Sequence, residues 1–172
     1  MLNDFLSEWL SDEINHAHAF QILYHHIYHE SQDSISQRLV SRQTNFSMID
    51  EFFSDLPSTC LLLAYDELIT THVYHQSIDF YDKLGSTMFS EFIRRLKYDE
   101  AKHYFGIISI VKDQFSGKRA LAESLLNKII QVDDAMDDYY GTFVLDHACP
   151  EFPLSKSNIM MLCEKIILRK ID

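Results

Sequence analysis

Glycine and proline are scarce in this sequence, which holds 4 glycines and 3 prolines among its 172 residues. Both residues interrupt regular helices, glycine through its backbone freedom and proline through its missing amide hydrogen. A chain with so few of them can form long, uninterrupted helices. We therefore predict an all-α fold, and the chain length favours a single domain over residues 1–172.

Cysteine pairs, long apolar runs and an excess of positive charge are also missing. The three cysteines, Cys60, Cys149 and Cys163, are odd in number and form no close pair, so we expect reduced thiols in a cytoplasmic protein. No apolar run approaches the roughly 20 residues that a membrane-spanning helix requires. The formal net charge of −11 disfavours nucleic acids and anionic membrane surfaces as partners.

Apolar residues recur at alternating spacings of three and four, as one buried face of a helix requires. This periodicity predicts long helices over residues 2–29, 58–84, 87–115 and 119–146, short helices over 35–42 and 48–53, and a last amphipathic helix over 156–171. Asp55 or Ser54 is expected to cap the helix that has Pro57 in its first turn. Gly85 is expected to end that helix in the left-handed conformation.

Two copies of one short motif, D-E-x-x-H, interrupt the apolar faces of two predicted helices. The first copy covers residues 12–16 and the second covers residues 99–103. A Glu and a His three positions apart lie on one helical face, so each copy offers two metal ligands side by side. A further acidic residue occupies a core-facing position on the helix between them. The candidate metal ligands are Glu13, His16, Glu67, Glu100 and His103.

A pair of metal ions would explain these core-facing polar groups, because a buried carboxylate is costly unless it is paired or bound to a cation. Carboxylates can bridge two ions, and each imidazole can cap one of them. Asp12 and Asp99, which precede the glutamates, are placed to accept the second N–H of the imidazole on the opposite helix. The alternative is a buried hydrogen-bonded network without metal. The acidic run over residues 133–138 is expected to face solvent instead.

The motifs resemble those of the soluble di-iron acyl-[acyl-carrier-protein] desaturases, a family of the ferritin-like group. The segment W-x-x-D-E-x-x-H over residues 9–16 is similar to that family's W-x-x-E-E-x-x-H, with Asp in place of the first acid. The segments E-x-x-T over residues 67–70 and D-E-x-x-H over residues 99–103 are similar to two further motifs, in the same order and at similar separations.

The resemblance implies a ferritin-like helical bundle with additional C-terminal helices, holding two iron ions or, alternatively, manganese. It implies O2-dependent desaturation or hydroxylation of an acyl chain that is carried as a thioester on acyl-carrier protein or coenzyme A. An external electron donor such as ferredoxin would be required. A bundle helix that the family has and this chain lacks would leave an apolar groove, which favours a homodimer or another partner chain.

The resemblance also assigns roles to residues beside the ligands. Thr70 would be a catalytic residue on the oxygen-binding face, and Trp9 and Asp99 would support packing and electron delivery around the irons. A narrow apolar channel for the acyl chain is expected beside the metals, and its candidate lining residues are Phe20, Leu63, Thr70 and Ile107.

One ligand of the family has no counterpart here. The family takes a further Glu from a helix before its first E-x-x-H helix, whereas this sequence begins with that E-x-x-H helix. Three explanations stay open: a shorter version of a longer protein, a replacement carboxylate (Asp133, Asp134, Asp137 or a partner chain's residue), or a degenerate site. Two other functional classes therefore also stay open, a non-catalytic ferritin-like metal-binding protein and a partner-dependent subunit.

Overall fold

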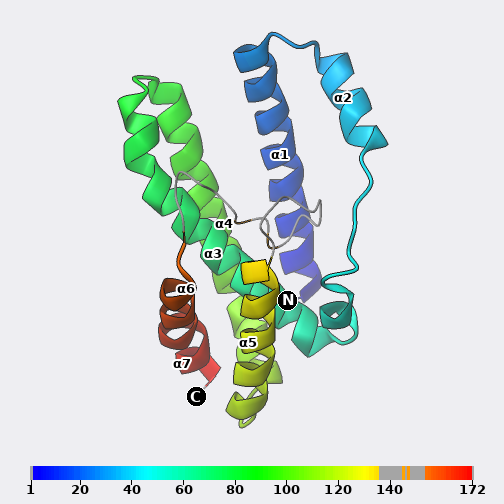
Figure 1. The fold of residues 1–172 in the computed structure, drawn as a ribbon, viewed down its shortest axis with the longest axis vertical. Coiled ribbons are helices and arrows are strands. Elements are labelled where there is room, and N and C mark those ends of the chain that lie inside the picture. The colour runs from blue at the N-terminus through cyan, green and yellow to red at the C-terminus, as the bar shows by residue number, and fades with distance from the viewer. Residues whose placement is uncertain (1, 136–144, 146, 148–153, 172) are drawn as a thin grey trace. The chain divides into compact units, whose positions relative to one another are not determined.

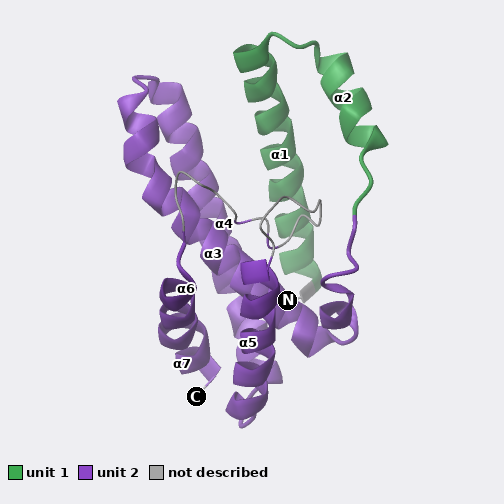
Figure 2. Ribbon diagram, viewed as in Figure 1, with its two compact units in different colours: residues 1–44 green, residues 45–172 purple. Residues whose placement is uncertain are grey.

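The computed structural model describes residues 2–135, 145, 147 and 154–171 of the chain. Its described residues form helices and connecting segments without strands (Figure 1), which confirms the predicted all-α fold. The chain divides into two compact units, residues 1–44 and 45–172, coloured separately in Figure 2. The single-domain organisation stays a prediction.

The first unit contains two helices, α1 (Leu2–Tyr28) and α2 (Gln32–Ser41). The predicted helices over residues 2–29 and 35–42 match them closely. Ser31 caps α2 by accepting a hydrogen bond from the amide of Ser34. Arg38 of α2 bonds the carboxylate of Glu30 at 2.8 Å and lies over the ring of Tyr24, so α2 is fastened to the end of α1 by its own side chains.

The second unit begins with a 3-10 turn (η1, Asp50–Phe53) and the long helix α3 (Leu56–Lys83). Asp55 is the N-cap of α3 and accepts a hydrogen bond of 2.8 Å from the amide of Ser58, with Pro57 in the first turn as predicted. Gly85 follows the helix with φ of +75°, a left-handed conformation that glycine adopts without steric cost.

Helix α4 (Thr87–Gln114) starts at the N-cap Ser86 and packs along α3, as Figure 1 shows. The fully or nearly buried apolar side chains of the two helices include Leu61, Leu62, Ile69, Ile93, Leu96 and Ile107. Burial of one such side chain stabilises a fold by roughly 1.5–3 kcal/mol, so this interface is the main core of the unit.

Helix α5 (Arg119–Ala135) packs against α3, and α6 (Lys156–Cys163) packs against α5. The predicted helix over residues 119–146 is confirmed as far as Ala135, and its remainder lies almost wholly outside the described residues. The tail continues from α6 through a π-helical turn (η2, Glu164–Leu168) into α7 (Arg169–Ile171), so the predicted helix over 156–171 is present but locally widened. Within the described ranges, no helix combines the length and apolar character that crossing a bilayer requires.

Candidate metal centre

Three of the predicted metal ligands meet inside the second unit. Nδ1 of His103 lies 3.2 Å from Oε2 of Glu100 and 3.4 Å from Oε2 of Glu67. Each of the three side chains offers one ligand atom, and these atoms lie within 4.8 Å of one another. Glu67 comes from α3, whereas Glu100 and His103 come from α4. We call these three residues the α3–α4 cluster.

The α3–α4 cluster is buried, with exposed fractions of 5%, 6% and 2% for Glu67, Glu100 and His103. Its position follows from the helical repeat, because Glu100 and His103 continue the same buried stripe as Leu96 and Ile107. Polar side chains are thus held at the centre of an apolar interface, where water cannot solvate them.

Burial has the largest effect on the pKa of Glu67. It raises the pKa of Glu67 to about 9, with the neighbouring Glu100 carboxylate adding to the rise and the hydrogen bond to His103 opposing it. Two carboxylates this close cannot both carry full charge without a compensating cation. A divalent ion would supply that charge, and two carboxylates with an imidazole are a donor set that suits Fe²⁺, Mn²⁺ or Zn²⁺. The residues present therefore fit a metal.

The other two predicted ligands lie in the first unit, on α1. Nδ1 of His16 is 3.7 Å from Oε1 of Glu13, so this E-x-x-H pair also places its carboxylate and imidazole side by side. His16 is 8% exposed, and Glu13, Asp12 and Trp9 are half-buried. The pairing predicted for Asp12 with His103, and for Asp99 with His16, joins the two units and stays a prediction.

Asp99 of α4, which directly precedes Glu100, is buried. Its carboxylate accepts a hydrogen bond of 3.1 Å from Nε of Arg95. Arg94, one turn earlier, makes two hydrogen bonds to the carboxylate of Asp82. Both arginines of the short basic stretch near residue 95 are therefore already paired with acids of this chain, which reduces the positive charge available to an acidic partner.

A second buried polar network was not foreseen from the sequence. It joins Tyr65, Asp66 and Thr70 of α3 to Asp133 of α5 and to His147. Tyr65 donates a short hydrogen bond to Asp133, and the imidazole of His147 lies between Asp133 and Asp66. Two of its members, Thr70 and Asp133, are candidate site residues of the sequence, but in other roles.

Asp133 corrects the expectation that the acidic run over residues 133–138 faces solvent, because its side chain is buried against Tyr65 and His147. Asp133 is also a candidate replacement ligand, but its carboxylate already bonds Tyr65 and His147. Asp134 is exposed and bonds Nζ of Lys156 at 2.8 Å. Asp137 lies outside the described residues.

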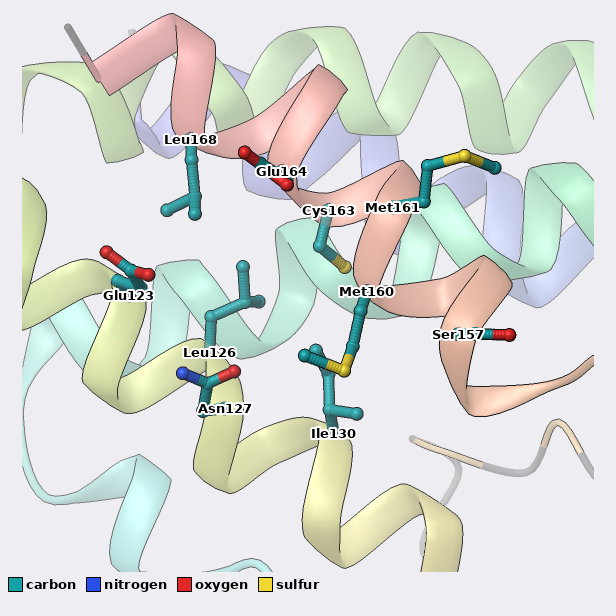
Figure 3. A pocket seen from close by; sticks show the side chains of 10 residues that line it. All are labelled: Glu123, Leu126, Asn127, Ile130, Ser157, Met160, Met161, Cys163, Glu164 and Leu168. Atoms are coloured by element: carbon teal, nitrogen blue, oxygen red, sulfur yellow. The ribbon is translucent and has the colours of Figure 1, made fainter.

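A surface pocket of about 360 Å³ lies between α5 and the α6–η2 segment. Figure 3 shows Leu126 and Ile130 of α5 on one side and Met160 and Cys163 of α6 on the other, with Glu123 and Glu164 at one end. None of the predicted channel residues lines it. Of those residues in the second unit, Ile107 is buried, and Leu63 and Thr70 are half-buried. The channel beside the metals therefore stays a prediction.

No protein-family model matches this sequence, and neither the curated proteins nor the solved structures contain a significant match to it. The likeness to the di-iron desaturases accordingly rests on the three motifs, and the geometry of the α3–α4 cluster stands as an independent observation.

Proposed function

We propose that this protein binds two iron ions through the α3–α4 cluster, completed by Glu13 and His16 of α1, and uses them with O2 to desaturate or hydroxylate an acyl chain. The supporting observation is the buried cluster itself, in which the ligand atoms of Glu67, Glu100 and His103 lie within 4.8 Å of one another. Manganese is the alternative ion.

Desaturation of an acyl chain requires electrons, protons and a site from which water is excluded. Removing two hydrogen atoms from an acyl chain while O2 is reduced to two water molecules consumes two further electrons and two protons. Reduced iron would supply the oxygen-binding site and the stored electrons. Apolar walls such as Leu96 and Ile107 would exclude water, and Thr70, three positions after Glu67 on the same helical face, would present its hydroxyl towards that side of the cluster.

The proposal requires an acyl thioester of acyl-carrier protein or coenzyme A as substrate and an external reductant such as ferredoxin. The pairing of Arg94 with Asp82 and of Arg95 with Asp99 disfavours docking of an acidic carrier at this stretch. A coenzyme A thioester is therefore the substrate to test first. A homodimer is part of the proposal, because a partner chain would cover apolar helix surface.

The direct test is the amount of tightly bound iron per chain after anaerobic loading with ferrous iron and removal of the excess. Two irons per chain would support the proposal and lead to assays of O2 uptake with acyl thioesters. One or none would contradict a complete di-iron site in this chain.

A metal-free buried network is the second candidate, favoured by the raised pKa of Glu67 and by the closeness of His103 to both carboxylates. Such a network would suit a partner-dependent subunit. Glu100→Ala separates the two cases. It abolishes iron binding if the cluster holds metal, whereas in a metal-free network it leaves metal content unchanged and raises stability by removing buried charge.

A further inference from the structure

The imidazole of His147 is bonded on both of its nitrogens inside the second unit. Nδ1 lies 3.3 Å from the carboxylate oxygens of Asp133. Nε2 lies 3.3 Å from Oδ1 of Asp66 and 3.3 Å from Oγ1 of Thr70. The side chain is 8% exposed, so water does not replace these partners.

This geometry favours a positively charged ring. A neutral imidazole carries one N–H, so one of its nitrogens would point a lone pair at a carboxylate oxygen. The imidazolium instead donates from both nitrogens, one to Asp133 and one to Asp66. Burial alone would lower the pKa of His147, but the hydrogen bonds to these two carboxylates outweigh it and raise the pKa to about 10.

Thr70 connects this ring to the face of α3 that bears Glu67. Its hydroxyl oxygen can accept from Nε2–H of His147, which leaves its own hydrogen to be donated elsewhere. Residues three apart on a helix are surface neighbours, so Thr70 and Glu67 share one face of α3. His147 is thus one hydrogen bond from Thr70, which shares a helix face with Glu67 of the α3–α4 cluster.

We propose that His147 is a positioning residue of the metal site that holds a buried proton and delivers it through the hydroxyl of Thr70 when O2 is reduced. This inference rests on the proposed function. His147 Nε2 gives its proton to Oγ1 of Thr70, and Thr70 passes its own hydroxyl proton to the basic oxygen that O2 reduction generates. The threonine is neutral before and after, the imidazolium becomes neutral imidazole, and solvent later restores its proton.

The groups that surround His147 favour this assignment. Tyr65 and Asp66 face the ring from α3 and Asp133 faces it from α5, while the thiol of Cys163 of α6 interacts with Tyr65 and Asp133. The Tyr65 hydroxyl donates to Asp133 and so anchors that carboxylate. Burial raises the pKa values of Tyr65 and Cys163, so both stay neutral, and the carboxylates that contact the ring are those of Asp66 and Asp133.

The protonation state can be measured without metal or turnover. Nitrogen-detected NMR of the histidine rings at pH 8 should show one ring with both nitrogens protonated, and that signal should vanish in His147→Gln. His75→Gln, a change at an exposed histidine of α3, is the matched control and should leave the signal in place. A neutral His147 ring at pH 8 would overturn the proposal.

The proton transfer itself is tested by a single oxidation of the iron-loaded full chain by O2, followed by stopped-flow absorbance between pH 6.5 and 9. In the wild type the rate should be constant over this range. In His147→Gln it should be at least about tenfold lower at pH 8 and should fall further with rising pH, because solvent now supplies the proton. Bound iron per chain should equal that of the wild type.

Two comparisons distinguish proton delivery by His147 from a role in packing alone. Adding His147→Gln to Thr70→Val should cause no further loss, because both residues act in one path. If His147→Gln lowers the oxidation rate by the same factor at every pH, His147 has a packing role only and the proposal is overturned. If the wild type binds no iron, the proposed function fails and the delivery role fails with it, whereas the NMR result on the imidazolium stands separately.

Discussion

Glu67 of α3 and His103 of α4 face each other across a helix interface, with Oε2 of the glutamate 3.4 Å from Nδ1 of the imidazole. The two side chains are 36 positions apart in the sequence and are both almost fully buried. Together with Glu100 they form a site whose carboxylates need either protons or cations to be stable there. Which of the two they hold decides between the proposed function and its alternative.

Replacing Glu67 by Gln should abolish iron binding and stabilise the metal-free protein. The amide mimics the protonated carboxylic acid, which the raised pKa of about 9 makes the metal-free form at pH 7. The gain in the free energy of unfolding at pH 7 should be no more than roughly 3 kcal/mol, the cost of keeping a group of ordinary pKa 4.5 protonated there. Urea unfolding and iron analysis measure the two effects, and Glu91→Gln on the exposed face of α4 is the control. Retention of two irons by Glu67→Gln would contradict its role as a ligand.

Replacing His16 by Gln should lower bound iron below two per chain if α1 completes the site. His18 lies two positions away on an exposed part of the same helix, so His18→Gln is a control of equal chemistry. Loss of a ligand should weaken binding of at least one ion by ~10-fold or more. Equal iron content in His16→Gln and His18→Gln would show that the first unit contributes no ligand through this histidine.

The stability of the protein should depend on pH through His147. Its folded pKa of about 10 lies above the ordinary 6.5, so its contribution is fully present below pH 6.5 and is lost as the pH rises towards 10. The loss over this window should be on the order of 4 kcal/mol, and His147→Gln should lack it. Urea unfolding of the metal-free wild type and of metal-free His147→Gln at pH 6, 8 and 10 gives the slope of the unfolding free energy against pH for each protein, with His75→Gln as control. Parallel slopes for the wild type and His147→Gln would contradict the ion pairs with Asp66 and Asp133.

Replacing Asp55 by Ala should cost about 1 kcal/mol of stability, because the first turn of α3 loses the side-chain cap on the amide of Ser58. Bound iron should not change, since the cap lies three helical turns before Glu67. Ser54→Ala, one position earlier on an exposed turn, should leave the urea midpoint within experimental error. A similar loss in both variants would show that the effect does not come from the cap.

Much of this protein was determined by the sequence alone. Helix ends at Asp55, Gly85 and Ser86, and the burial of Glu67, Glu100 and His103, follow from capping chemistry and from a repeat of 3.6 residues, which act over a few neighbouring positions. Glu100 and His103 lie on one buried stripe of α4. Their approach to Glu67 could therefore be predicted once α3 and α4 were known to pack together.

The tertiary structure alone decided the surroundings of Thr70. His147 reaches Thr70 from 77 positions away, and Asp133 reaches Tyr65 from 68. The sequence suggested solvent exposure for Asp133, since an acidic run on a helix usually faces water. Its burial depends on where α5 crosses α3, and no local periodicity encodes that crossing. A long-range polar network of this kind becomes visible only when the helices have packed, because its members satisfy one another and not their sequence neighbours.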